Sequence, residues 1–410
     1  MKGRPGFYNA MILHRIQQGN RILAAWRRRG DVWLFDGKLR EILFKVCVMP
    51  VFEYSVNIWG AGNFKSTVWK EAENFWFRCA RLILGAPLRS PKAAVFGDLG
   101  WRDFKFRASC LACKFWTRAI EMPDERLVRK ALCEQKRLVL EGRPCWLRNL
   151  RDSLKETVFG GEVWEKFVSL DEFKGPCHRL VKDGNLNVVK TVRWESDFGN
   201  AFASVLDAAW WQRVASGEGR NERMQRERTA LRVSPQFMIK NKCDINVRDL
   251  HVLYRHKTRS YALFKSQSFC QEAYVQHITN VAHRNVFVRF RLGVSSLRIE
   301  TGRWETCGYP GTGGIPVEWR ACFCCDKSKV EDEIHFFAEC PCFGDARQLL
   351  FLRVIESEKL AFNFFELLPS HAVFSFLVGS QNKRVIRAVA EFVWKAFQMR
   401  SEVLCNRQKD

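Results

Sequence analysis

The sequence predicts a mainly α-helical protein, and three observations support this. Residues 67–84 place apolar side chains at the spacing of one helix face. Several other segments repeat that spacing along the chain. Evidence for strands is thin by comparison, because only 186–194 is rich in β-branched residues and 246–265 alternates weakly. We therefore expect helices accompanied by short β pieces.

Turn and capping residues mark the ends of the predicted helices. Ser66 or Thr67 can cap the helix at 67–84, and Gly85-Ala86-Pro87 ends it. Ser90-Pro91 begins a short helix, because serine caps and proline is tolerated in the first turn. Further helices are expected at 8–28, 36–48, 101–121, 124–135, 146–158, 200–215, 221–232, 345–360 and 383–401.

Two segments are expected to be linkers. Residues 216–222, SGEGRNE, are polar, and residues 306–316, TCGYPGTGGIP, are rich in glycine and proline. Glycine frees the backbone and proline removes a hydrogen-bond donor, so regular structure is disfavoured in both. The second linker immediately precedes the densest group of cysteines.

Charge points to a polyanionic partner. The 410 residues include 67 Lys and Arg against 44 Asp and Glu, a formal net charge of +23. Nucleic acid is the first candidate and an anionic membrane surface the second. Residues 41–61 are the most apolar stretch, but Lys45, Pro50 and Glu53 interrupt it. We expect no membrane partner and no secretory signal, and hence a reducing location in the nucleus or cytoplasm.

Five of the sixteen cysteines fall between Cys322 and Cys342. The other cysteines are scattered singly and are expected to be small buried hydrophobic residues. Sixteen cysteines in a long chain without a signal do not indicate a disulfide framework. The group at 322–342 indicates metal binding instead.

The spacing Cys-x2-Cys-x9-His-x4-Cys is carried by Cys322, Cys325, His335 and Cys340. Two thiolates on a tight turn can bind one face of Zn²⁺, and a histidine and a cysteine at a nascent helix can complete a tetrahedron. Such a closed site is structural, because no coordination position remains for a substrate. Cys324 and Cys342 compete as ligands, and His335 could instead be a core histidine beside two phenylalanines.

Several segments resemble LINE-type (non-LTR) retrotransposon reverse transcriptases. The residues CFCC and VEDEIHFFAECP resemble that family's zinc knuckle, with Asp332 where glutamate is common. RFRLGVSSLRIETGRW (289–304) resembles the segment before the knuckle. LFKVCVMPVFEYSVNIWG (43–60) resembles the thumb, and FGDLGWRDFKFRASCLACKFW (96–116) the helical segment after it. VIRAVAEFVWKAF (385–397) resembles the closing helix.

The resemblance implies four regions. These are a thumb-like helical region at 1–122, a helical linker region at 123–284, a basic segment with a CCHC zinc knuckle at 285–345, and a C-terminal helical region at 346–410. The polymerase of this family needs palm aspartates, including an adjacent pair that holds metal ions. The 410 residues contain no Asp-Asp pair, and Asp31 is the first aspartate. We therefore expect no polymerase or endonuclease activity.

Two groups of basic residues are candidates for contact with nucleic acid. Arg27, Arg28 and Arg29 could neutralise phosphates, or could form the solvated end of a helix. The second group lies in and before the knuckle: Arg289, Arg291, Arg298, Arg303, Lys327 and Lys329. Aromatic neighbours such as Trp304 could stack on unpaired bases or pack in a core.

The sequence thus predicts a nucleic-acid-binding fragment of a LINE-type reverse transcriptase with structural Zn²⁺ and RNA or DNA as partner. Two alternatives remain open. The chain could be the non-catalytic part of an RNA-directed DNA polymerase, whose missing domain is supplied in cis or in trans. It could also be a helical protein-interaction module.

Overall fold

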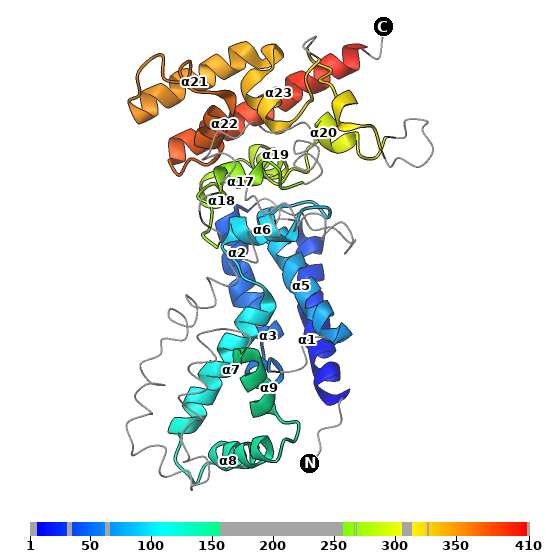
Figure 1. Cartoon of the computed structure of the whole chain (residues 1–410), viewed down its shortest axis with the longest axis vertical. Helices are drawn as coiled ribbons and strands as arrows, with labels where there is room; N and C mark the ends of the chain where they lie inside the picture. Colours follow the sequence, from blue (N-terminus) through cyan, green and yellow to red (C-terminus); the bar gives the residue numbers. More distant parts are fainter. Residues whose placement is uncertain are drawn as a thin grey trace. The chain divides into compact units, whose positions relative to one another are not determined.

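The structure is a computed structural model that describes residues 6–30, 35–61, 66–155, 257–265, 267, 269–305, 314–325 and 328–407. The predicted class is confirmed, because helices dominate these ranges and no strand forms in them (Figure 1). The β structure among the described residues is limited to an isolated antiparallel bridge between Ala321 and Val330. The chain divides into two compact units, which are described separately below.

The first unit comprises Met1–Arg29, Leu43–Arg78 and Arg102–Ala209. An aromatic cluster fills its core. The Phe52 ring lies 4.6 Å from Phe75 and 4.7 Å from Phe104, and Trp59 lies 5.8 Å from Phe104. Its elements are α1 (Gly6–Arg29), the π-helix η2 (Phe44–Val48), α3 (Met49–Phe52), α4 (Val56–Trp59), α5 (Thr67–Leu84) as far as Arg78, α7 (Phe104–Glu121), α8 (Leu127–Leu140) and α9 (Trp146–Lys155).

The second unit comprises Gly30–Ile42, Cys79–Trp101 and Trp210–Asp410. Its longer helices α19, α21, α22 and α23 pack around a phenylalanine core, in which Phe290 lies 5.8 Å from Phe336 and Phe337 lies 5.2 Å from Phe392. Its elements are α2 (Gly37–Leu43), the end of α5, α6 (Lys92–Leu99), α17 (Tyr261–Phe264), α18 (Tyr274–His277), α19 (Val281–Arg291), α20 (Arg298–Thr301), the 3₁₀ helix η4 (Val317–Trp319), the π-helix η5 (His335–Glu339), the 3₁₀ helix η6 (Pro341–Phe343), α21 (Gly344–Glu358), α22 (Ser370–Val378) and α23 (Lys383–Arg407).

A buried network of charges crosses the second unit. The Arg291 guanidinium lies 2.9 Å from Glu272 and 3.3 Å from Asp98, and it also donates to the Val378 carbonyl. Tyr261 and Tyr274 donate to Asp98 at 2.7 and 2.6 Å. Burial, and then the nearby Asp98 charge, raises the pKa of both tyrosines well above its usual value. Opposite charges and hydroxyl donors thus compensate the burial of these ions.

Sequence signals located the ends of α5 correctly. The Trp69 amide donates to the Ser66 hydroxyl at 3.2 Å, so Ser66 is the cap. The helix ends at Leu84, and Gly85 follows with a φ of 76° that favours glycine. Ser90 differs from our expectation: α6 begins at Lys92 after Pro91, and no side chain caps it.

One expected strand is wrong in its described part. Residues 257–265 form a turn and α17, because Tyr261 and Phe264 are both buried at a helical spacing. Gly293, with a φ of 61°, lies so close to the Lys257 carbonyl that a Cβ atom at this position would clash with it.

Several expected elements lie outside the described residues. These are 186–194, 200–215 and 221–232, the linker 216–222 and residues 306–313 of the second linker.

Candidate metal centre

The first two candidate ligands lie on a turn that is closed by backbone hydrogen bonds. The Cys322 amide donates to the Lys329 carbonyl at 2.8 Å, and the Glu331 amide donates to the Arg320 carbonyl at 2.9 Å. These bonds flank the bridge between Ala321 and Val330. The Cys324 amide also donates to the Cys322 sulfur at 3.4 Å, a contact that favours a thiolate at Cys322.

The other two ligands lie at the ends of a single wide helical turn. Within η5, the Cys340 amide donates to the His335 carbonyl at 2.7 Å. The Asp332 carboxylate accepts from the His335 amide at 2.7 Å and so caps the start of this turn. Pro341 lacks an amide hydrogen and begins η6 directly after Cys340. The turn therefore directs the imidazole of His335 and the thiol of Cys340 to the same point.

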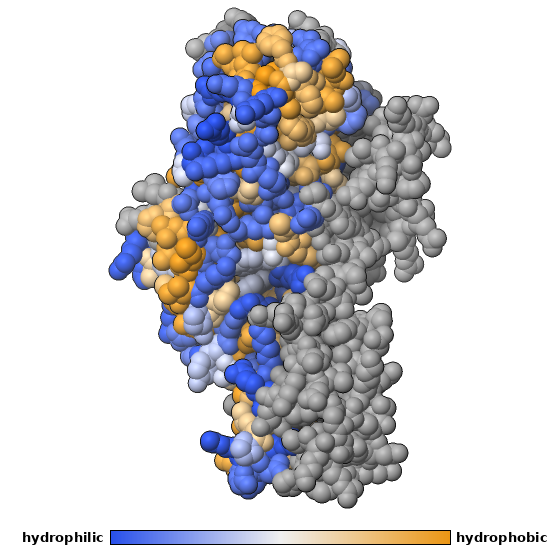
Figure 2. Space-filling model, turned by 90° about the vertical axis from the view of Figure 1, so that its left-hand side faces the viewer, coloured by the Kyte–Doolittle hydropathy of each residue, from blue (hydrophilic) through white to orange (hydrophobic). Residues whose placement is uncertain are grey.

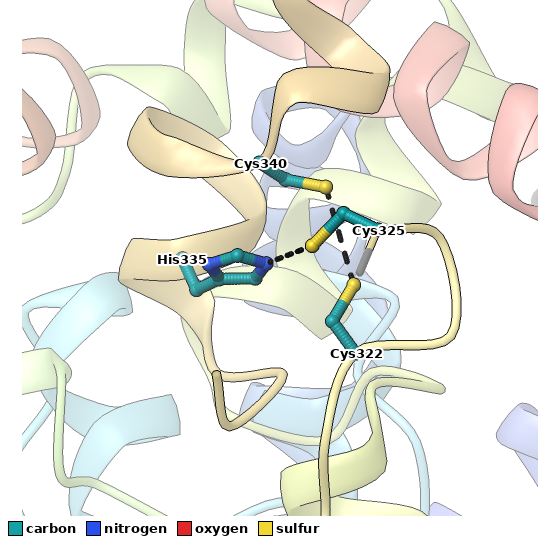
Figure 3. A group of neighbouring side chains, drawn as sticks. All are labelled: Cys322, Cys325, His335 and Cys340. Atoms are coloured by element: carbon teal, nitrogen blue, oxygen red, sulfur yellow. Dashed lines mark hydrogen bonds between the residues drawn. The ribbon is translucent and has the colours of Figure 1, made fainter. Parts of the chain in front are cut away.

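All four side chains converge, as Figure 3 shows. The ligand atoms of Cys322, Cys325, His335 and Cys340 lie within 4.8 Å of one another, and all four residues are buried. The Cys322 and Cys340 sulfurs are 3.9 Å apart, and the Cys325 sulfur lies 3.4 Å from the His335 Nε2 atom. A tetrahedral zinc ion requires separations of about 3.8 Å between sulfurs and about 3.5 Å between sulfur and nitrogen. The residues present therefore fit a zinc ion.

A second group contains Cys322, Cys324 and Glu331, whose ligand atoms are equally close. Glu331 is already bound, because the Arg400 guanidinium pairs with both its carboxylate oxygens at 2.7 and 2.8 Å. The Arg298 amide donates to the same carboxylate at 2.7 Å. Cys324 is also only half buried. The set with His335 is thus the better ligand set.

Electrostatics at the site favour binding of a cation. Hydrogen bonds with Cys324 and then Cys340 lower the pKa of the Cys322 thiol far below its usual value, and the same contacts raise the pKa of both partners. Burial lowers the pKa of His335, but the interactions with Cys322, Asp332 and Glu339 together outweigh this effect and raise it. These contacts favour a thiolate at Cys322 over one at Cys324 or Cys340. A divalent cation would allow the ligand thiols to ionise together.

The His335 Nδ1 atom is the other ring nitrogen of the candidate ligand. It is buried, has no hydrogen-bond partner among the described residues, and lies 3.6 Å from the Glu339 carboxylate. Lys329 pairs with the same carboxylate at 2.9 Å. Metal-bound histidines usually donate their second ring N–H to such a carboxylate, which fixes the ring. Glu339 is therefore placed to orient His335.

Sequence reasoning missed the support that Glu331 and Arg400 give to this centre. Glu331 lies 3.9 Å from the Cys322 sulfur and holds Arg400 of α23 against the site. Glu331 stands inside the motif, but nothing local identifies its partner, because Arg400 is distant in the sequence. Only the fold brings α23 to the candidate ligands.

The structure places the basic candidates in different settings. Arg27, Arg28 and Arg29 are exposed in the last turn of α1, and Arg289 is exposed on α19. Lys329 is exposed but paired with Glu339, and Lys327 lies outside the described residues. Arg298 pairs with Glu305 and Arg303 with Glu300, each at 2.8 Å, and both side chains are largely enclosed.

Arg291 is the clear correction to the sequence prediction. Its side chain is 1% exposed and is neutralised by Asp98 and Glu272, so it does not lie on a surface that nucleic acid can reach. The alternation of exposed Arg289 and buried Arg291 follows from their position on α19, whose buried face also carries Phe287 and Phe290. The residue types alone do not show which of these two arginines is buried.

Comparisons with protein-family models, curated proteins and solved structures found no match to this chain. None of the described helices is both long enough and apolar enough to cross a bilayer.

Proposed function

We propose that the chain is a zinc-stabilised, nucleic-acid-binding C-terminal fragment of a LINE-type reverse transcriptase, without catalytic activity of its own. The convergence of Cys322, Cys325, His335 and Cys340 on one buried point carries this proposal. The ligand spacing matches the knuckle that the sequence resembles, and the four positions meet in space.

Zinc is the cation that suits the donors best. Three thiolates and one imidazole form a soft, closed, tetrahedral set. Zinc bound there contributes folding free energy by linking the turn at Cys322 to the helical turn at His335, and binding to finger peptides is worth about 10–16 kcal/mol. The role of the ion is structural, because the protein supplies all four ligands.

Phosphate neutralisation is the proposed mode of nucleic-acid binding. The net charge of +23 favours association with any polyanion. The exposed arginines at the end of α1 and Arg289 on α19 have guanidinium groups that can approach a phosphate backbone. Each phosphate contact releases counterions, so affinity depends on salt and little on sequence.

The test is a salt titration of the full chain with a fluorescently labelled oligonucleotide, followed by anisotropy. We expect the logarithm of the binding constant to fall linearly with the logarithm of salt concentration. Absence of binding at low salt, or affinity that does not respond to salt, would overturn the proposal.

An apolar surface favours a second candidate, a helical protein-interaction module. Leu349 and Leu352 on α21 are 54% and 48% exposed, and Phe362 and Leu367 after it are 77% and 74% exposed. Figure 2 shows apolar side chains gathered at the top of that view, in the region of α21 and α22. Association through such a surface would respond weakly to salt, so the same titration separates the two candidates.

A further inference from the structure

Trp304 and Trp319 are unusual among the tryptophans of this chain. They are 61% and 60% exposed, whereas Trp59, Trp69 and Trp76 are at most 3% exposed. No other tryptophan in the described residues is exposed. An indole ring is a large apolar surface, and leaving it in water forgoes the free energy of burying it. Two such rings on one unit therefore suggest a ligand with flat faces.

Trp304 already has a cation on one face of its ring. The Arg89 guanidinium lies 4.8 Å from the ring centroid, and the Lys257 ammonium donates to the Arg89 carbonyl at 2.8 Å, which holds that segment in place. Arg89 is exposed and forms no salt bridge with any described residue. Its charge thus remains available to a phosphate while its plane supports the indole.

Trp319 belongs to the same part of the unit. The neighbouring Arg320 donates to the Ile299 carbonyl at 2.8 Å and to the Ile315 carbonyl at 2.7 Å, and its side-chain carbons pack against Gly302. The Ile315 amide donates to the Gly302 carbonyl at 2.7 Å. These contacts join the segment that carries Trp319 to the segment that carries Trp304.

Three arginine side chains, those of Arg259, Arg303 and Arg320, lie close together in the part of the unit that carries the two rings. Burial lowers the pKa of Arg303, the Glu300 charge raises it, and the nearby charges of Arg259 and Arg320 lower it further. Glu300 pairs with Arg303 at 2.8 Å and lies 3.9 Å from Arg259, which offsets part of this charge. Arg259 also pairs with the Glu333 carboxylate, so these buried charges are largely compensated, and the exposed Arg89 is the cation next to Trp304.

We propose that Trp304, supported by Arg89, and Trp319 form a stacking platform for the unpaired bases of single-stranded nucleic acid. The inference rests on the proposed function and narrows it to single strands. A base stacks on the face of Trp304 opposite Arg89, while Arg89 contacts the adjacent phosphate. Stacked bases in a duplex have no free faces to offer, and every base has a face that can stack, so the platform selects single strands without reading sequence.

The test compares binding of labelled oligouridine and of a duplex of the same length to the full chain. Trp304→Ala should weaken oligouridine binding at least about tenfold, which corresponds to about 1.4 kcal/mol, and leave the salt slope unchanged because no charge is removed. Trp304→Phe should restore most of the affinity. Leu88→Ala is the matched control, since Leu88 is 83% exposed beside Arg89 but offers no ring.

Circular dichroism reports whether each variant is correctly folded, and duplex affinity measures the phosphate contacts that Trp304→Ala should leave intact. Equal oligouridine binding by wild type and Trp304→Ala would overturn the platform while leaving the proposed function intact. Equal losses for single strand and duplex would overturn it too, because stacking predicts a selective loss. If the wild type binds neither probe, the proposed function fails first and the platform fails with it.

Discussion

Two adjacent cysteines have opposite assignments in the candidate metal centre. Cys325 is buried and its sulfur lies 3.4 Å from the His335 Nε2 atom, whereas Cys324 is half buried and donates its amide to Cys322. We expect Cys325→Ser to lose zinc, because a three-ligand remnant binds it weakly, and Cys324→Ser to retain one zinc per chain. Elemental analysis of the purified variants measures both. Loss of zinc from Cys324→Ser alone would mean that the ligand set is wrong.

Arg291 and Arg289 offer a second pair of neighbours with opposite roles. Arg291→Met should destabilise the second unit by about 3–5 kcal/mol, because Asp98 and Glu272 would stay buried without their cation. Arg289→Met should change stability by no more than about 0.5 kcal/mol, since Arg289 is exposed. Urea unfolding followed by circular dichroism gives both values. Similar stabilities for the two variants would contradict the buried-ion assignment.

The candidate metal ligands were predictable because their signal is local. Their spacing along a short segment limits which side chains can meet, and the structure brings the predicted set together. Arg291 was not predictable, since its ion partners come from α6 and from residues just before α18. We expected Arg291 at the surface only because its side chain is charged.

Helix α1 ends in three exposed arginines. Replacing Arg27, Arg28 and Arg29 with alanine should weaken nucleic-acid binding for all sequences and flatten the salt slope by about 0.9 for each phosphate that is no longer neutralised. A matched control removes three exposed basic residues from the start of α23: Lys383, Arg384 and Arg387. Equal effects of the two triple variants would indicate a response to total charge rather than direct binding by α1.

Sequence periodicity predicted the long helices far better than the short ones. Helix α5 matched its predicted range because an apolar face, a serine cap and a terminal glycine agree. Helices α17, α18 and α20 each span about one turn, too short for a 3.6-residue period to be detected. The segment of η5 was expected only as a nascent helix. A hydrogen bond from the Cys340 amide to the His335 carbonyl, five residues earlier, closes its wide turn, and residue spacing does not reveal this bond.

Zinc should stabilise only one of the two units of the chain. All four ligands, and Arg400 behind them, belong to the second unit. Chelation should therefore increase amide hydrogen exchange at 320–345 and near Arg400, while α1, α4 and α7 of the first unit keep their protection. Hydrogen-exchange mass spectrometry measures both sets. Equal deprotection of both units would show that the ion stabilises the chain as a single cooperative body.

X-ray absorption at the zinc edge, on the purified 410-residue chain, tests the proposed zinc site. We expect one zinc ion with three sulfur ligands at about 2.3 Å and one nitrogen ligand at about 2.0 Å. His335→Ala should remove the nitrogen contribution or the metal itself. A first shell of oxygen ligands, four sulfurs that include Cys324 or Cys342, or a chain that binds no zinc would contradict the metal centre described for Cys322, Cys325, His335 and Cys340.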